Sequence, residues 1–389
     1  MLMKERRGRD WYLSVMIAFL VAIAVFGYLY WFKFDGQITG FFRIGSELAL
    51  SPYLDPEQTL IYPGELGYDG QQFLSIALDP GLTNPDSVAA LDHPAYRYRR
   101  IFYPLLGYCL GLGNAAWIPW ALVLMNVTAI AIGTGLIGLL LPPTVSPFNA
   151  LGVLAIPGVW MVLSLSTADL LASVWGLGAI LCWQKHRIGG MALCLGGGLL
   201  TRETLLVIGV ALVLSQYRRR QWSAIAAVGV SLVPLISWLG VIRWRQLPGG
   251  SGSGNFGWPL VGIGEKFQAL VSNGVTGSNL YEAYLWALLT IGLGLLLWTR
   301  GRGIFAPRRE IEVTKEGLTG LTISYASWLY VGLWLVASFY ILNYYLNYSR
   351  VFLDIFLFCL LIPPPYAGAK KGFFLACGLA SLAFLGLQS

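Results

Sequence analysis

The stretch WYLSVMIAFLVAIAVFGYLYWF, residues 11–32, decides the class of fold. It carries no charged side chain and is long enough to cross the roughly 30 Å of hydrocarbon in a bilayer as one helix. It is too long for the apolar core of a signal peptide, and no small-residue cleavage site follows it cleanly, so we expect an uncleaved helix. Similar apolar runs recur along the whole chain. The sequence therefore predicts an all-α, polytopic membrane protein, with residues 1–389 forming a single transmembrane domain.

Composition and charge support this class. Hydrophobic residues make up 56% of the chain and charged residues only 12%, against about 25% charged in soluble domains. The formal net charge is +7, but the cations form short clusters between apolar runs rather than one basic face, which argues against a nucleic-acid partner. By the positive-inside rule these clusters mark cytoplasmic ends. They comprise Lys4, Arg6, Arg7, Arg9, Lys185, Arg187, Arg218 to Arg220, Arg300, Arg302, Arg308, Arg309, Lys370 and Lys371.

Assigning these clusters to one side fixes the order of the spans. Further spans are expected at 115–141, 148–165, 167–183, 224–244, 281–298, 323–342, 351–362 and 373–387. With the first span and one hairpin, this gives about nine to eleven crossings of a bilayer. Residues 33–114 are then a large first extracytoplasmic loop, whose surface helices carry the candidate active site. A second outer loop opens with the Gly/Ser-rich residues 249–254 and precedes a surface helix around Lys266.

A hairpin is needed because the basic residues Arg187 and Arg218 lie too close in sequence for two full spans between them. Its apex would be residues 201–204, Thr-Arg-Glu-Thr. Charged residues at membrane depth are tolerated only when they are buried in protein or face a wet cavity. Arg202 and Glu203 are therefore candidate functional residues.

The first outer loop holds nine of the 19 acidic residues of the chain, and its centre reads GYDGQQFLSIALDP, residues 67–80. The helical spacing of its apolar residues and the final proline predict a short helix lying on the membrane surface. Asp69 would begin this helix and has two interpretations. It could cap the helix by accepting backbone N–H bonds, or it could act as a catalytic base, with Gly70 leaving room for a substrate.

The tract YRYRRIFYP, residues 96–104, places cations and aromatic rings at the outer interface, against the positive-inside preference. Arg97, Arg99 and Arg100 would suit a lipid phosphate or pyrophosphate, which arginine binds bidentately. Alternatively, they extend to lipid headgroups or pair with local acids.

Two further charged positions have simple structural interpretations. Arg350 falls at the outer end of a span, and Asp354 lies one turn further along, which predicts an i,i+4 ion pair. Asp169 lies in the outer turn between two spans and is expected to cap a helix there.

Residues 68–73 (YDGQQF), 79–80 (DP) and 96–104, in a long outer loop directly after the first span, resemble the GT-C superfamily of membrane glycosyltransferases. They look like a bacterial branch linked to cell-surface glycopolymer formation. They are also distantly similar to the Trp-Asp and Phe-Pro elements of the GPI mannosyltransferases that act second in that pathway, with Tyr68 in place of Trp. Residues 199–203, LLTRE, are similar to the Thr-Arg element that those families carry on a broken helix.

The resemblance implies transfer of a sugar from a polyprenyl-phosphate donor to an acceptor hydroxyl, with inversion at the anomeric carbon. The acceptor would be a glycan, lipid or protein, and the active site would face outward from a bacterial inner membrane. Asp69 would be the base, and preorganised cations would stabilise the leaving phosphate. The cations implied are Arg202, Arg350, Arg97, Arg99 and Arg100, supported by Tyr68, Gln71, Glu203 and Tyr103.

Several alternatives remain open. The triplet Asp35-Gly36-Gln37 repeats Asp69-Gly70-Gln71 just beyond the first span, where some GT-C members keep their acid, so Asp35 is a second candidate base. No Asp-X-Asp pair of the metal-linked kind occurs, so no cofactor is indicated. The cysteines show no paired spacing that would suggest zinc. A multi-span transporter or flippase of lipid-linked glycans is the main alternative, although no paired inverted repeats are apparent. A non-catalytic scaffold is a third.

Overall fold

The computed structural model describes residues 2–218, 220–249, 253–274, 276–300 and 315–387 of the chain. The strands found in this part of the chain are two short ones, β1 (Ile44–Gly45) and β2 (Ile61–Tyr62), which pair in parallel. The other regular elements described are helices. The all-α fold expected from the sequence is therefore confirmed.

Within the described residues, six helices are long and apolar enough to cross a bilayer. They are α1 (Leu2–Tyr28) continued by η1 (Leu29–Lys33), α6 (Ile118–Leu140), α11 (Trp222–Ser231) continued by α12 (Val233–Trp244), α14 (Gly277–Arg300), α16 (Lys315–Val336) and α20 (Ala367–Gly386) preceded by η9 (Pro364–Tyr366). A seventh candidate is the pair η5 (Pro147–Ala155) and α7 (Pro157–Leu165), bent by 61°. The bend falls before Pro157, which has no backbone N–H to continue the preceding helix. The described residues therefore supply six or seven candidate spans, fewer than the nine to eleven crossings expected from the sequence. The chain is a polytopic integral membrane protein, as expected.

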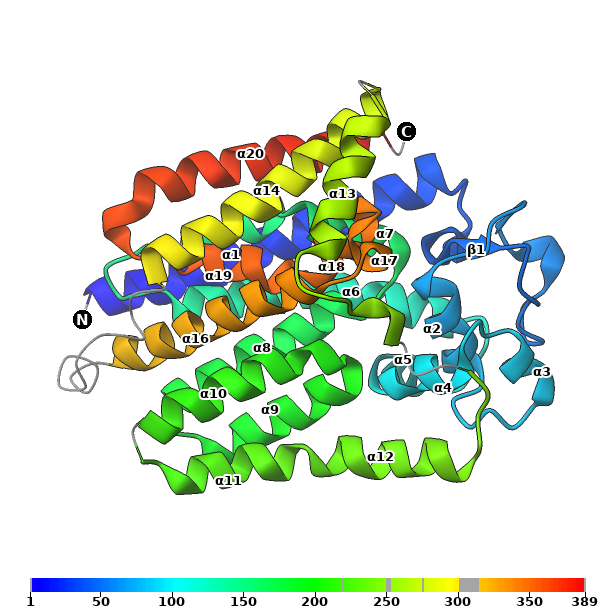
Figure 1. The fold of residues 1–389 in the computed structure, drawn as a ribbon, viewed down its shortest axis with the longest axis horizontal. Coiled ribbons are helices and arrows are strands. Elements are labelled where there is room, and N and C mark those ends of the chain that lie inside the picture. Colours follow the sequence, from blue (N-terminus) through cyan, green and yellow to red (C-terminus); the bar gives the residue numbers. More distant parts are fainter. Residues whose placement is uncertain (1, 219, 250–252, 275, 301–314, 388–389) are drawn as a thin grey trace.

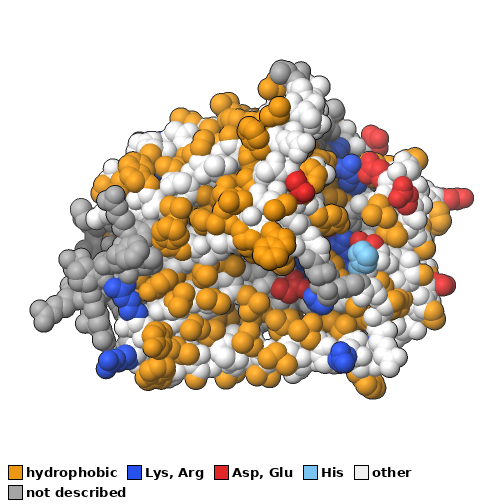
Figure 2. Space-filling model, in the orientation of Figure 1, with side chains coloured by type: hydrophobic (Ala, Val, Ile, Leu, Met, Phe, Trp, Pro, Cys, Tyr) orange, Lys and Arg blue, Asp and Glu red, His pale blue; other side chains and the backbone are white. Residues whose placement is uncertain are grey.

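The outward faces of these helices match a lipid surrounding. Only 22% of the most apolar window is buried in the α1 span and in the α11–α12 span, and α11 and α12 expose side chains such as Val230 (63%) and Ile236 (63%). Figure 2 shows hydrophobic side chains across much of one face of the molecule, with most of the charged side chains on that face toward its two ends. Water would solvate such a surface poorly, whereas lipid tails are as apolar as the side chains themselves.

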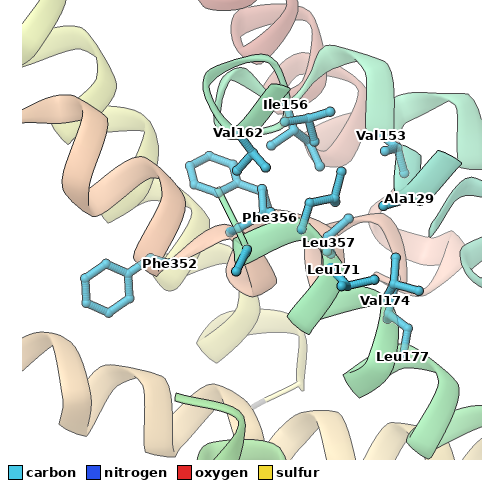
Figure 3. Packing of buried hydrophobic residues seen from close by; sticks show 14 of the residues in the cluster. Ala129, Val153, Ile156, Val162, Leu171, Val174, Leu177, Phe352, Phe356 and Leu357 are labelled. Atoms are coloured by element: carbon cyan, nitrogen blue, oxygen red, sulfur yellow. The ribbon is translucent and has the colours of Figure 1, made fainter. Parts of the chain in front are cut away.

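Shorter helices fill the interior between the long ones. They are α8 (Asp169–Gln184), α9 (Ile188–Thr201), α10 (Leu206–Arg218), α17 (Phe339–Leu342), α18 (Tyr345–Val351) and α19 (Leu353–Leu360). Residues 351–362 were expected to span the membrane, but α19 has eight residues, all buried, so it belongs to the core and that expectation was wrong. Figure 3 shows Leu357 of α19 packed near Leu171 of α8 and Val153 of η5.

The hairpin expected between the basic clusters has a structural counterpart. Helix α9 ends at Thr201, Arg202 is extended (φ −160°, ψ 129°), and a single turn, η6 (Glu203–Leu205), leads into α10. The chain reverses direction at this break, so α10 returns toward the end where α9 began (Figure 1). Helices α9 and α10 have 14 and 13 residues, fewer than the roughly 20 that a full crossing requires. The charged tetrapeptide therefore lies where two short helices meet.

Residues 33–114 gather at one end of the molecule, on the right of Figure 1, and form what we call the cap. Its helices are η2 (Ile38–Phe42), η3 (Pro56–Gln58), α2 (Asp69–Leu78), α3 (Pro85–Ala89), α4 (Pro94–Arg97), η4 (Tyr98–Arg100) and α5 (Phe102–Leu110). The second outer loop supplies η7 (Ser253–Asn255) and α13 (Val261–Ser272), which contains Lys266 as expected.

Helix α2 differs from the surface helix that the sequence suggested. Every residue from Gly70 to Leu78 is buried, and α2 packs against α5 and α6. Its polar side chains are satisfied inside the protein, since Gln71 accepts a hydrogen bond from Gly45 N at 3.0 Å. A Cβ at position 70 would lie 2.2 Å from the carbonyl oxygen of Leu165, so only glycine permits this close approach. The cap is thereby fixed to the helical core at the start of α2.

Candidate functional site

A cavity of about 760 Å³ lies where the cap meets the helical core. Its wall is built by the start of α2, by α4 and η4, by the break between α9 and α10, by α18 and by the segment leading into α13. The charged residues that line it are Asp69, Asp92, Arg97, Arg99, Arg100, Arg202, Glu203 and Arg350. Nearly all the residues implied by the resemblance therefore share one wall, although they are far apart in the sequence.

Asp69 is the first residue of α2, but it does not cap the helix. Tyr68 occupies the N-cap position, with no side-chain cap bond, so the capping interpretation of Asp69 was wrong. The two carboxylate oxygens of Asp69 instead accept hydrogen bonds from two arginines, Oδ1 from Arg97 Nη1 at 2.5 Å and Oδ2 from Arg350 Nη2 at 3.1 Å. Burial alone would raise the pKa of Asp69, but the charges of these arginines outweigh it and hold that pKa well below its usual range.

Arg97 is shared between two carboxylates. Besides Asp69 it binds Asp92 through two parallel bonds, Nη2 to Oδ2 at 2.6 Å and Nε to Oδ1 at 2.8 Å. Burial opposes the pKa shift of Asp92, but the hydrogen bond and charge of Arg97 lower it. Pairing with a local acid, one of the alternatives for the arginine tract, is thus observed for this residue, and it leaves Arg97 on the cavity wall.

Arg100 and Arg99 follow Arg97 on the same wall. Arg100 is 7% exposed, and it donates from Nε to Glu203 Oε2 at 3.2 Å and from Nη2 to the Tyr96 hydroxyl at 2.5 Å. The guanidinium of Arg99 lies 6.0 Å from the centre of the Tyr96 ring. Glu203, a supporting residue implied by the resemblance, therefore contacts Arg100.

Arg350 does not form the i,i+4 pair expected from the sequence. Helix α18 ends before Phe352 (φ −102°, ψ 22°), so Asp354 belongs to a separate helix and accepts a hydrogen bond from Tyr330 instead. Arg350 donates to Asp69 and to the hydroxyl of Tyr68, the latter at 2.7 Å. The break between α18 and α19 places Asp354 on a separate helix from Arg350.

Asp169 is the main residue that sequence reasoning undervalued. It was expected to cap a helix, but it pairs with both Arg202 and Arg350 behind the cavity wall. An acidic residue within an apolar region of a membrane protein is expensive and usually has a specific partner. That rule, applied more strictly, could have identified it.

Three implied residues lie away from the cavity. Gln71 holds the backbone of Gly45, and the buried Tyr103 hydroxyl contacts Ser166 Oγ at 3.0 Å and Asn126 Nδ2 at 2.9 Å. Both are structural contacts within the core. Asp35 is exposed, has a positive φ of 49°, and is not among the lining residues.

The charges and apolar surfaces of the cavity suit one kind of ligand. Of the described residues, five arginines and three carboxylates line it, which leaves an excess of positive charge. The apolar part of the lining includes Leu206, Val207, Leu333, Phe339, Ile341, Val351 and Phe352. Arginines bind phosphate strongly and bidentately, and an apolar wall accepts a hydrocarbon chain. The cavity is therefore chemically matched to an anion that carries an apolar tail.

A metal centre is not apparent in the part of the chain that the structure describes, where no three His, Cys, Asp or Glu side chains group closely enough to hold an ion. Comparison with known proteins adds no assignment. No protein family, no characterised protein and no solved structure matches the chain. The site is therefore interpreted from its own geometry and from the motifs in the sequence.

Proposed function

We propose that this protein is an inverting, GT-C-type glycosyltransferase that moves a sugar from a polyprenyl-phosphate donor to an acceptor hydroxyl. The observation that carries the proposal is that one cavity combines Asp69, five arginines and an apolar wall. A donor of this class has a phosphate for the arginines and a hydrocarbon chain for the apolar wall, and its acceptor needs a base.

The chemical step assigns a role to each side of the cavity. The acceptor oxygen attacks the anomeric carbon, the bond from that carbon to the phosphate oxygen breaks, and the configuration inverts. Asp69 accepts the hydroxyl proton, and the polyprenyl phosphate leaves with the bonding electron pair. Arg97 and Arg350, with Arg99, Arg100 and Arg202, stabilise the charge that grows on the leaving phosphate.

The ion pairs of Asp69 bear on its strength as a base. A carboxylate with a strongly lowered pKa is a weak proton acceptor, and Arg97 and Arg350 lower the pKa of Asp69. A bound donor phosphate would share these two guanidiniums and weaken their hold on the carboxylate. Asp69 would then become more basic when the donor is in place.

Asp69 is preferred to Asp35 as the base because it lines the cavity with the arginines, whereas Asp35 is exposed outside it. Gly70 does not leave room for a substrate as the sequence suggested, because a Cβ there would lie 2.2 Å from the carbonyl oxygen of Leu165 in the core.

The proposed setting is the inner membrane of a bacterium, with the cavity on the extracytoplasmic side, in cell-surface glycan assembly. The basic N-terminal residues and the turn between α8 and α9 lie at the end of the molecule opposite the cap (Figure 1). By the positive-inside rule, this arrangement favours a cytoplasmic position for that end and an outer position for the cap. The acceptor would be a glycan, a lipid or a protein, and membrane lipids surround the helices.

The test is sugar transfer by the purified full chain in lipid nanodiscs, supplied with radiolabelled polyprenyl-phosphate sugars and a crude envelope acceptor. We expect Asp69→Asn to lower the rate about 10²–10⁴-fold, as loss of a general base does. Asp35→Asn is the matched control and should keep wild-type activity. The reverse pattern would make Asp35 the base, and a wild type that uses none of the donors would favour a flippase, testable as movement of fluorescent lipid-linked glycans.

A further inference from the structure

Asp169 has no part in the chemical step described above, yet it is among the most tightly enclosed carboxylates in the described structure. Its side chain is 3% exposed, and it is not among the residues that line the cavity. It stands at the first position of α8, and the hydroxyl of the preceding Thr167 donates to its Oδ2 at 2.7 Å. A ligand in the cavity would meet the arginines before it met Asp169.

The contacts of Asp169 join two cationic side chains from different parts of the fold. Oδ1 pairs with Arg202, which lies at the break between α9 and α10. Oδ2 accepts from Arg350 Nη1 at 2.9 Å, and Arg350 belongs to α18. One carboxylate thus brings two guanidiniums to the same wall of the cavity.

The ion pairs with Asp169 occupy only some of the N–H donors of Arg202 and Arg350. Arg350 uses Nη2 for Asp69 and Tyr68 on the cavity side. Arg202 is 7% exposed and lines the cavity, and its Nε has no hydrogen-bond partner among the described residues. Because this buried nitrogen makes no hydrogen bond, the ion pair with Asp169 is what holds the guanidinium of Arg202 in the described structure.

We propose that Asp169 is a positioning residue that fixes Arg202 and Arg350 as a pair for the phosphate of an isoprenyl phosphate ester. That the phosphate belongs to a sugar donor rests on the proposed function. The competing explanation is that Asp169 only neutralises buried positive charge. The two explanations predict opposite changes in the Kd of an anionic ligand when Asp169 is replaced. Loss of a neutralising charge leaves the cavity wall more positive and lowers the Kd, whereas loss of a positioning residue raises it.

The test is binding of farnesyl phosphate to the full chain in nanodiscs, measured by calorimetry. We expect Asp169→Asn to raise the Kd about tenfold or more, because charge-assisted hydrogen bonds lose their geometry. Asp354→Asn is the matched control, since Asp354 is also a buried carboxylate (7% exposed) but accepts its hydrogen bond from Tyr330, and it should keep the Kd within about twofold of wild type. Thr167→Val retains the carboxylate and removes one of its bonds, so a smaller increase of about two- to tenfold is expected, and this variant serves if Asp169→Asn does not fold.

Three outcomes would overturn the inference: no binding by wild type, unchanged or tighter binding by Asp169→Asn, and equal losses in Asp169→Asn and Asp354→Asn. Binding is measured without sugar transfer, so the two proposals can fail separately. If wild type binds farnesyl phosphate, Asp169→Asn weakens that binding and no sugar is transferred, the positioning role of Asp169 stands and the proposed transferase activity is rejected. In an active protein, Asp169→Asn should raise the donor KM and also lower kcat per folded molecule, whereas a general loss of folded protein would leave the donor KM unchanged.

Discussion

The chain contains the triplet Asp-Gly-Gln twice, at 35–37 and at 69–71, and the two copies have different surroundings. The first follows the end of the α1 span in a turn, with Asp35 and Gln37 exposed. The second begins α2, where Asp69 lines a cavity together with five arginines and Gln71 is buried. Identical residues are thus a solvated turn in one place and the start of a candidate active site in the other.

The difference shows that the side chains around an aspartate, and not the local triplet, determine whether it can take part in catalysis. Arg97 comes from α4, and Arg350 from α18 near the other end of the chain. The first triplet is not among the residues that line this cavity. Each position of the triplet offers a paired substitution that tests this contrast.

The glycines should show the largest difference. In Gly70→Ala the new Cβ would meet the Leu165 carbonyl oxygen at 2.2 Å and Phe42 Cα at 3.0 Å. Backbone cannot yield as a flexible side chain does, so we expect a loss of about 3 kcal/mol or more of unfolding free energy. In Gly36→Ala the nearest atom is 3.6 Å away, and the strain comes only from the positive φ of 75°, which predicts a loss of about 1–2 kcal/mol.

Equilibrium unfolding by SDS in mixed micelles measures both variants. Equal losses in Gly70→Ala and Gly36→Ala would mean that the start of α2 is not held against the core as described.

Much of the fold follows from patterns that the sequence displays. Apolar length predicted the spans that became α1, α6 and α14, and charge spacing predicted the break at Arg202. The prediction from apolar length was wrong for residues 351–362, because an apolar run does not reveal whether lipid or protein surrounds it. The prediction that α2 lies on the membrane surface was wrong for a similar reason. Its hydrophobic periodicity does not show that the polar side chains of Gln71 and Gln72 accept hydrogen bonds inside the protein.

The sequence could predict which residues belong to the candidate site, but not which of them form ion pairs with one another. Arg97, Arg202 and Arg350 were each singled out by charge at an unfavourable depth or by motif. Their partners depend on which helices pack together, and Asp169 pairs with Arg202 and Arg350 only because α8, α18 and the α9–α10 break meet. The expected pair of Arg350 with Asp354 failed because α18 ends between them, and nothing in the local sequence marks that end.

The aspartates should differ in how they link stability to pH. Folding lowers the pKa of Asp69, so the folded state binds fewer protons than the unfolded state, whose Asp pKa is about 3.9. The stability that Asp69 provides is then complete above about pH 4 and is lost as the pH falls below that value. We expect Asp69→Asn to cost about 2 kcal/mol at pH 7, less than the loss of a sole partner, because Arg97 keeps Asp92 and Arg350 keeps Asp169.

The same SDS titrations at several pH values check this. The difference between wild type and Asp69→Asn should be constant from pH 8 to pH 5 and shrink below about pH 4. Asp35→Asn should match wild type within about 0.5 kcal/mol throughout, since its side chain is exposed. A difference that changes between pH 8 and pH 5 would contradict the lowered pKa of Asp69.

The glutamine pair should give the smallest difference in unfolding free energy. Both substitutions leave every charged residue in place, so this pair tests hydrogen bonding and packing alone. Gln71→Leu keeps the approximate side-chain size but leaves the buried N–H of Gly45 without its acceptor, which predicts a loss of about 1–2 kcal/mol. Gln37→Leu changes an exposed side chain and should stay within about 0.5 kcal/mol of wild type. Because Gln71 holds β1 rather than a ligand, sugar transfer per folded molecule should survive Gln71→Leu. If activity falls while stability does not, Gln71 acts on the cavity itself, and the second triplet would supply two functional side chains instead of one.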